Sequence, residues 1–159
     1  MGKIVKLTEL VQIRRKARKE NKKLVFTNGC FDLLHRGHIE YLKKAKSLGD
    51  ILIVGLNSDS SVRKIKGKGR PIQKQSDRVT ILASLYFVDY VVIFGELTPF
   101  KLISKLIPDI LVKGGDWKVK DIVGKDIVES HGGKVLNLKM VKGKSTRNII
   151  QTILNRFRR

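Results

Sequence analysis

Apolar and polar positions along this chain form blocks that are typical of strands followed by helices. Residues 51–56 are a near-continuous apolar run, which indicates a strand covered on both faces. Residues 37–48 instead place Ile39, Leu42 and Ala45 on one side of a helix that ends at Gly49. The same patterns predict strands at 24–27, 51–56, 88–94, 109–113 and 134–140, and helices at 7–20, 37–48, 76–85, from 98 onward, 123–130 and from 145 to about 156.

Five strands that alternate with helices predict an α/β fold, a doubly wound, Rossmann-like parallel five-stranded sheet with helices on both faces. With 159 residues, the chain is expected to be a single domain (1–159), with an N-terminal helical segment at 1–22 and an α/β core at 23–159. Residues 58–75 are polar and should form a mobile loop after a short helical turn. Because ligands of such sheets bind beyond the carboxyl ends of the strands, candidate chemistry is expected directly after each strand.

Composition narrows the class of protein. Apolar residues make up 42% and aromatic residues 6%, which argues against disorder. A single cysteine, Cys30, excludes a disulfide framework and a cysteine-rich zinc site, and we expect it to be a buried packing residue. No apolar run approaches the roughly 20 residues that span a bilayer. Lys3 and Lys6 interrupt the short apolar stretch near the start, so we expect no signal peptide there. Together these observations predict a cytoplasmic protein without a membrane span.

The net charge of +20 is the unusual quantity, with 34 Lys and Arg against 14 Asp and Glu. Such a field attracts polyanions such as nucleic acid or phosphate-rich small molecules. Basic residues occur along the whole chain, with local clusters at 14–19, 64–70 and 156–159. Non-specific polyanion binding and a merely solvated, charge-rich surface both fit this distribution.

The segment after the first predicted strand carries the most specific motif, His35-Arg36-Gly37-His38 at the start of a helix. Residues three apart share a helix face, and a helix N-terminus attracts anions. Two imidazoles there suit a polyphosphate, because they can stabilise charge on a phosphoryl group and its leaving pyrophosphate. Helix-capping histidines or a metal pair are the alternatives, the metal pair being weaker because the only other histidine is His131.

Polar residues also follow the second predicted strand and its loop. Asn57 and Asp59 either bind a ligand or cap the next turn. Lys66 and Arg70 lie among glycines, which let the backbone move, so these cations could close over phosphates. A solvated basic loop is the alternative for each cation taken singly.

Two further strand ends complete the pattern. Gly114 permits close backbone approach before Asp116, and Trp117 offers a flat face for a base, although a lone tryptophan is more often a packing residue. Ser145 and Thr146 open the last helix, as a second anion-binding terminus or as an ordinary serine cap.

Together these segments resemble the H-x-G-H nucleotidyltransferases, and among them the adenylyltransferases of ADP-heptose synthesis. The likeness covers nearly the whole chain, through 26–38, 54–59, 66–72, 111–116 and, least specifically, 143–146. Related sequences usually read Ser-Thr-Thr at the last helix, and here Arg147 replaces the second Thr.

The resemblance implies that the phosphate of a sugar 1-phosphate, D-glycero-β-D-manno-heptose 1-phosphate, attacks the α-phosphorus of ATP in line with the departing pyrophosphate. Mg²⁺ is the implied counter-ion, and no covalent enzyme intermediate is implied. The implied role is lipopolysaccharide core biosynthesis, and we expect a homo-oligomer, a dimer. A cytidylyltransferase acting on glycerol 3-phosphate or a similar small phosphate, and a non-enzymatic nucleic-acid-binding protein, are the alternatives.

The resemblance also implies roles for individual residues. His35 and His38 would stabilise the transition state, and backbone N–H groups near Phe31 and Asp32 would hold phosphate. No metal site built from protein side chains is implied. The implied nucleotide- and phosphate-binding residues are Thr27, Asn28, Phe31, Asp32, Lys46, Arg78, Gly114, Asp116, Trp117, Ser145 and Thr146, and the candidates for the sugar phosphate are Asn57, Asp59, Lys66 and Arg70.

Overall fold

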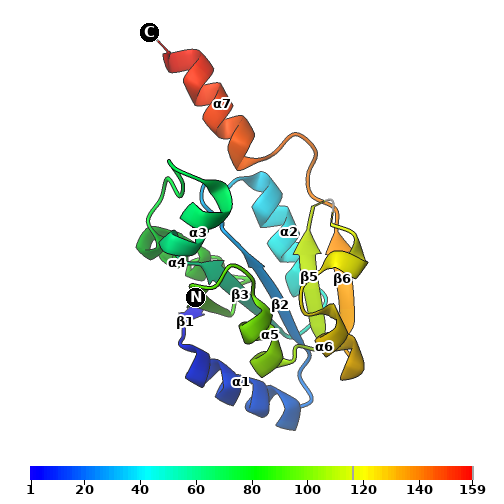
Figure 1. The fold of residues 1–159 in the computed structure, drawn as a ribbon. Coiled ribbons are helices and arrows are strands. Elements are labelled where there is room, and N and C mark those ends of the chain that lie inside the picture. Colours follow the sequence, from blue (N-terminus) through cyan, green and yellow to red (C-terminus); the bar gives the residue numbers. More distant parts are fainter. Residues whose placement is uncertain (116, 159) are drawn as a thin grey trace.

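A single parallel sheet forms the centre of the computed structural model, which describes residues 1–115 and 117–158. Its strands are β1 (Lys3–Ile4), β2 (Leu24–Gly29), β3 (Ile51–Asn57), β4 (Tyr90–Phe94), β5 (Ile110–Gly114) and β6 (Lys134–Leu138). They lie in the order β1-β4-β3-β2-β5-β6, and every neighbouring pair is parallel (Figure 1). The parallel α/β prediction is therefore confirmed, with six strands rather than five. The additional strand, β1, has two exposed residues, too few to show any periodicity.

Helices cover both faces of this sheet (Figure 1). They are α1 (Leu7–Lys19), α2 (Arg36–Lys46), α3 (Asp59–Lys66), α4 (Gln75–Ala83), α5 (Phe100–Leu106), α6 (Lys125–Ser130) and α7 (Thr146–Phe157), with the short 3-10 helix η1 (Val119–Asp121). Two clusters of buried apolar side chains divide the helices between the faces: α2 and α4 pack on one face, and α1, α5 and α6 pack on the other.

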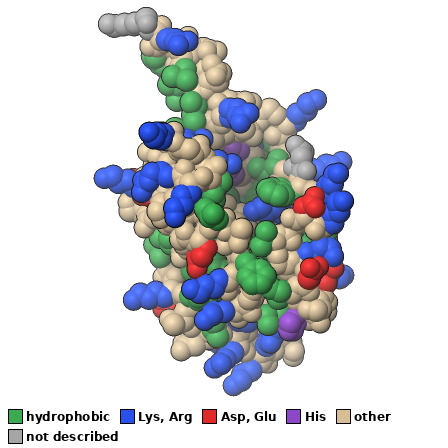
Figure 2. All heavy atoms as spheres, in the orientation of Figure 1, with side chains coloured by type: hydrophobic (Ala, Val, Ile, Leu, Met, Phe, Trp, Pro, Cys, Tyr) green, Lys and Arg blue, Asp and Glu red, His purple; other side chains and the backbone are tan. Residues whose placement is uncertain are grey.

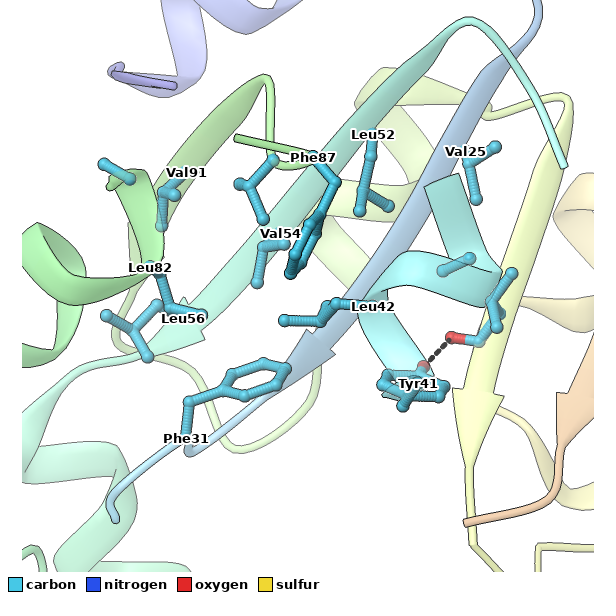
Figure 3. Packing of buried hydrophobic residues seen from close by; sticks show 14 of the residues in the cluster. Val25, Phe31, Tyr41, Leu42, Leu52, Val54, Leu56, Leu82, Phe87 and Val91 are labelled. Atoms are coloured by element: carbon cyan, nitrogen blue, oxygen red, sulfur yellow. Dashed lines mark hydrogen bonds between the residues drawn. The ribbon is translucent and has the colours of Figure 1, made fainter. Parts of the chain in front are cut away.

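Strand β2 shows how one segment serves both clusters. Leu24 and Phe26 point to the face covered by α1, α5 and α6, whereas Val25 points to the face covered by α2 and α4. Figure 3 shows the cluster on the face covered by α2 and α4, in which Leu42 and Leu82 approach the sheet from these two helices. Fully burying a side chain of this size stabilises the fold by about 1.5–3 kcal/mol. Because both faces are covered, the central strands are apolar without alternation, as the sequence predicted.

Two helix starts differ from the sequence-based expectation. Helix α4 begins with Lys74 at its N-cap, because Ser76 lies inside the first turn rather than before it. Helix α5 begins after Pro99, which is the N-cap rather than the first helical residue. The expected turn after residue 58 is the eight-residue helix α3, capped by the Ser58 hydroxyl. These shifts leave the strand ends, where the candidate residues lie, unchanged.

The surface is basic without one dominant patch. Figure 2 shows Lys and Arg side chains spread over the visible face, with few acidic ones between them. At one end of the molecule α7 extends away from the body, and none of its residues is buried (Figure 1). Within residues 1–115 and 117–158, no helix combines the length and apolar character needed to cross a bilayer.

Candidate active site

A cleft of about 570 Å³ lies beyond the carboxyl ends of β2 and β5. These two strands are neighbours in the middle of the sheet, and their chains continue to opposite faces, α2 after β2 and η1–α6 after β5. This is the topological switch point of a doubly wound sheet, and its volume is in the range of small-molecule sites. The cleft gathers these sequence-predicted residues: Asn28, Phe31, Asp32, His38, Asn57, Lys66, Arg70, Gly114, Trp117, Ser145 and Thr146.

The histidine motif lies where β2 turns into α2. His35 is the extended N-cap of α2, and His38 stands in its first turn. Their rings stack, with centroids 3.9 Å apart and an angle of 23° between the planes. A Cβ at Gly37 would lie 3.0 Å from the His35 ring, so the glycine between them leaves room for this stacking. The spacing H-x-G-H therefore builds a pair of rings at a helix N-terminus.

Both rings also carry a polar atom that the fold leaves unpaired. The Nδ1 atoms of His35 and His38 are buried without a hydrogen-bond partner among the described residues. Burial lowers the pKa of His38 from 6.5 to about 4, and the neighbouring His35 adds to this shift. Burial also lowers the pKa of His35, assisted by the charge of Lys144. Without an anion, both imidazoles are therefore neutral at pH 7, and an arriving polyphosphate would favour their protonation.

Phe31 closes one side of this pair. Its ring lies 5.2 Å from the His38 ring, and its backbone adopts a positive φ of 43° in the turn that leaves β2. A Cβ at Gly29 would lie 2.9 Å from the Phe31 ring, so Gly29 provides the space that this ring occupies. The turn thus fixes the orientation of His38 through contact with an aromatic ring.

Asp32 holds a loop rather than a phosphate with its side chain. Its fully buried carboxylate accepts hydrogen bonds from Arg70 Nε at 2.5 Å and from the Ile72 and Gln73 amides at 2.8 and 2.9 Å. Burial alone would raise the pKa of Asp32, but these hydrogen bonds outweigh it and lower that pKa. The loop that carries Arg70 is therefore tied to the end of β2.

Arg78 was expected to contact phosphate; that contact stays a prediction, and in this structure the residue does not line the cleft. Its buried guanidinium donates to the carbonyls of Cys30, Asn57 and Gln73, at 2.6, 2.9 and 3.0 Å, and pairs with Asp59 at 2.7 Å. Asp59 therefore neutralises Arg78 and does not line the cleft, and its contact with the sugar phosphate stays a prediction. Both residues instead fix the ends of β2 and β3 relative to each other.

Lys46 and Thr27 were also expected to contact the nucleotide, and neither lines the cleft. Lys46 lies at the opposite end of α2, where its Nζ pairs with Asp89 Oδ2 at 2.6 Å. The Thr27 hydroxyl is buried 2.5 Å from the Tyr41 hydroxyl, and Tyr41 donates to the Val112 carbonyl (Figure 3). In this structure both side chains join elements of the fold, and their contact with the nucleotide stays a prediction.

Helix α7 brings its N-terminus to the same cleft. The Ser145 hydroxyl caps the helix by accepting from the Asn148 amide at 3.1 Å, and the Thr146 hydroxyl donates to the Leu33 carbonyl at 3.4 Å. Arg147, which stands where related sequences have threonine, also lines the cleft. Asp116, predicted to lie near the nucleotide, is outside the described residues.

The structure adds residues that the sequence analysis did not assign to the site. Lys113 lies on the cleft floor, with Nζ 3.0 Å from Asn28 Oδ1 and 5.8 Å from the centre of the half-exposed Trp117 ring. Cys30 is half-buried in the same floor rather than packed in the core, which corrects its predicted role. Lys113 ends a strand directly before Gly114, so the strand-end rule could have identified it. An apolar wall also lines the cleft, formed by Ile65, Leu97, Pro99, Ile122 and Val123.

Comparison with known proteins agrees with this geometry. The family model described as cytidylyltransferase-like matches residues 26–154. The bifunctional protein HldE of Syntrophotalea carbinolica is 56% identical over 140 residues, which are 88% of this chain and 29% of that protein. The HldE protein of Geobacter metallireducens is 54% identical over 156 residues, 98% of this chain and 32% of that protein. The chain thus spans about a third of the length of these curated relatives.

Solved structures share the fold. A lipopolysaccharide core biosynthesis protein from Thermoplasma volcanium GSS1 has a TM-score of 0.63 and 31% identity, covering 77% of this chain and 99% of that one. A pantoate-β-alanine ligase from Francisella tularensis, with a TM-score of 0.66 and 20% identity, covers 94% of this chain and 73% of that one and shares the fold alone. Since the family model spans residues 26–154 and more than half of the aligned residues are identical in both HldE relatives, the chain belongs to the cytidylyltransferase-like family.

Proposed function

We propose that the protein is an adenylyltransferase that joins ATP and a sugar 1-phosphate to give an ADP-sugar and pyrophosphate. The observation that carries this proposal is the His38 ring, which lines the central cleft at the N-terminus of α2 and on which the His35 ring is stacked. The sugar we propose is D-glycero-β-D-manno-heptose 1-phosphate. The sequence likeness to ADP-heptose adenylyltransferases, the two HldE relatives and the lipopolysaccharide core biosynthesis structure support this choice.

The proposed chemistry is a single displacement at phosphorus. A phosphate oxygen of the sugar 1-phosphate forms a bond to the α-phosphorus of ATP while the bond from that phosphorus to the bridging oxygen breaks, and pyrophosphate leaves. Charge accumulates on the transferred group and on the leaving pyrophosphate. His38 and the N-terminus of α2 lie where they can donate hydrogen bonds to these oxygens, and His35 orients the His38 ring by stacking on it.

Mg²⁺ is part of the proposal as a companion of ATP. In the described part of the chain, no three His, Cys, Asp or Glu side chains come together as a ligand set, and Asp32 is already bonded to Arg70. Mg²⁺ commonly keeps several waters and binds substrate phosphates with one or two carboxylates. The cleft therefore suits an ion held by the triphosphate, which would neutralise phosphate charge there.

The alternatives have less support. A cytidylyltransferase for glycerol 3-phosphate needs the same histidine pair, so the choice of base and acceptor depends on the sequence likeness. A nucleic-acid-binding role would use the net charge of +20, but the cations are spread over the visible face (Figure 2). That role also leaves the buried histidine pair without a purpose.

A pyrophosphate-release screen tests the proposal. It combines each of the four nucleoside triphosphates with sugar 1-phosphates and glycerol 3-phosphate, and His38→Ala protein serves as the control for contaminating activity. ATP with D-glycero-β-D-manno-heptose 1-phosphate should give the highest kcat/KM. A higher value for CTP with glycerol 3-phosphate would contradict the assigned base and sugar while leaving the histidine mechanism intact. Release that is unchanged in His38→Ala protein would contradict the mechanism as well.

A further inference from the structure

The single cysteine, Cys30, lines the cleft together with Lys66, Arg70 and Lys113, and its carbonyl accepts a hydrogen bond from Arg78 at 2.6 Å. The charges of Lys66, Arg78, Arg70 and Lys113 all act on the Cys30 thiol, whose pKa burial nevertheless raises. Arg70 is paired with Asp32 at 2.5 Å, and Arg78 with Asp59 at 2.7 Å. Among the described residues, neither Lys66 nor Lys113 has a carboxylate within 4.0 Å. Within residues 1–115 and 117–158, this part of the cleft thus holds two cations that pair with a carboxylate and two that do not.

Lys113 is the more informative of these two lysines. Its ammonium donates to two oxygens of one residue, Asn28 Oδ1 at 3.0 Å and the Asn28 carbonyl at 3.5 Å, and both are neutral acceptors. Burial lowers the pKa of Lys113, Cys30 opposes this, and the charge of Lys66 lowers the pKa further. A cation on a partly desolvated floor, beside a second cation, is unfavourable unless an anion joins it. The arrangement therefore suits a ligand that brings negative charge.

The reaction itself requires a second anion position. In-line transfer needs the attacking phosphate on the side of the α-phosphorus opposite to the leaving pyrophosphate. The attacking phosphate and the triphosphate repel each other when they come close enough to react. Cations must therefore also lie beside the attacking phosphate. The N-terminus of α2 with His38 serves the triphosphate, whereas Lys113 extends from β5, the neighbouring strand.

We propose that Lys113 is a further residue of the subsite for the phosphate of the second substrate, a phosphate monoester, and that it binds this phosphate together with Lys66, which the sequence resemblance already assigns to it. This inference rests on the proposed nucleotidyl transfer for its substrate and on the residues around Cys30 for its position. Lys113, which donates a hydrogen bond to Asn28, would bind the phosphate from the floor of the cleft. Lys66, the last residue of α3, would bind it from the end of that helix. The loop that follows α3 is anchored by the ion pair between Arg70 and Asp32. A phosphate there brings the two unneutralised cations together around one dianion.

The chain contains one cysteine and one tryptophan, and both lie at this subsite, so each reports on it without turnover. The first experiment measures alkylation of Cys30 by iodoacetamide at constant ionic strength with increasing inorganic phosphate, alongside the fluorescence of Trp117. It compares wild-type protein with Lys113→Met and with the matched control Lys118→Met, an exposed lysine five positions away. Each protein is normalised to its own rate without phosphate.

Phosphate should protect Cys30 and change Trp117 fluorescence in wild-type and Lys118→Met protein. In Lys113→Met protein the phosphate concentration for half protection should rise by roughly 10- to 100-fold, because one charge-assisted hydrogen bond is lost. Equal protection in wild-type and Lys113→Met protein would overturn the subsite. This result does not depend on which nucleotide or sugar the enzyme uses, so it separates the subsite from the proposed function.

Steady-state kinetics provide the second test. Lys113→Met should raise KM for the sugar 1-phosphate by roughly 10-fold or more while KM for ATP stays within about 2-fold, and Lys113→Arg should recover part of the loss. A rise confined to KM for ATP would assign Lys113 to the nucleotide and overturn the proposal. A purely structural role would lower the melting temperature and change both KM values together.

Discussion

Two helices begin at the same cleft, and they are held there in different ways. Helix α2 buries Tyr41, Leu42 and Ala45 against the sheet, so its first turn is fixed by the core. Helix α7 has no buried residue, and Thr146 is bonded to the body only through the Leu33 carbonyl at 3.4 Å among the described contacts. In Figure 1, α2 lies within the body and α7 projects from it.

This difference separates a preorganised part of the site from an adjustable one. The donors at the start of α2 are already oriented, which is what stabilisation of a developing charge requires. The start of α7 can shift at small cost, because few packed side chains move with it. We therefore expect loss of a donor at the start of α2 to affect catalysis strongly, loss of the contacts that anchor this region to lower global stability, and changes in α7 to remain local.

The largest effect should come from His38→Ala. Loss of one preorganised donor should lower kcat by about 10²–10³-fold, or about 3–4 kcal/mol, while the melting temperature changes little. The pyrophosphate-release assay and thermal unfolding measure the two quantities. His131→Ala, an exposed histidine on α6's C-terminal side, is the control and should leave both unchanged. If His38→Ala protein kept an activity within a few-fold of wild type, the claim that the start of α2 is preorganised for catalysis would be contradicted.

The next effect concerns the carboxylate that anchors the α3–α4 loop beside α2. Asp32→Asn keeps the shape of the side chain but places an NH₂ group against donors from Arg70 and the Ile72 and Gln73 amides. The free energy of unfolding in urea should fall by about 3 kcal/mol. The exposed Asp126→Asn variant should stay within about 0.5 kcal/mol of wild type. A stability equal to wild type in Asp32→Asn protein would show that this loop is as loosely held as α7.

A smaller effect should appear in the proton balance of binding. The pKa of His38 is lowered to about 4 in the free protein, and a polyphosphate beside it should raise that pKa. Binding of ATP between pH 5 and 6 should therefore take up on the order of one proton, measurable by calorimetry in buffers of different ionisation enthalpy. His38→Ala should reduce this uptake to the part that His35 contributes. Net release of protons on binding would contradict the proposed contact between His38 and the polyphosphate.

The same lowered pKa also predicts how stability depends on pH. Because the folded state favours the neutral ring, its contribution to stability is complete above the unfolded pKa of 6.5 and is lost as pH falls toward about 4. Urea unfolding between pH 4 and 7 measures this loss, and His38→Ala should weaken it.

The smallest effects should come from removing the serine cap of a helix that packs against the core and the serine cap of α7, which does not. Ser58 caps α3, which buries Val62, and Ser145 caps α7, which buries nothing. Ser58→Ala should lower the free energy of unfolding by about 1 kcal/mol, whereas Ser145→Ala should change it by less than about 0.5 kcal/mol. In the second variant, hydrogen exchange should accelerate only near the start of α7. Equal global losses would show that α7 is part of the cooperative fold.

The sequence predicted the strand ends well because burial on both faces leaves a plain apolar signal. It also predicted where the histidine pair would lie, since parallel strands bring their carboxyl ends together. The two-residue β1 gave no such signal. The expected homo-oligomer stays a prediction, because the structure contains one chain.

Individual cations were harder to assign from sequence. Lys46 pairs with Asp89, 43 positions away, and Arg78 pairs with Asp59, 19 positions away. No local pattern indicates such partners, so both residues looked like free phosphate ligands. Lys113 stands at a predicted strand end, where the sequence could have pointed to it, but its half-buried position and its neutral neighbours, which distinguish it from the other lysines, appear only in the fold.

The line along which β2 and β5 pair, here called the seam, affects the order in which the protein folds and unfolds. Strand β2 pairs with β3 through six register positions starting 27 residues apart in sequence (Leu24 with Ile51), but with β5 through three starting 85 apart (Val25 with Ile110). Closing the longer loop costs about 1 kcal/mol more entropy, and fewer backbone hydrogen bonds offset it. We expect this seam to close late in folding and to open early on heating. His38 and Lys113 lie on opposite sides of it, so activity should disappear before the sheet melts.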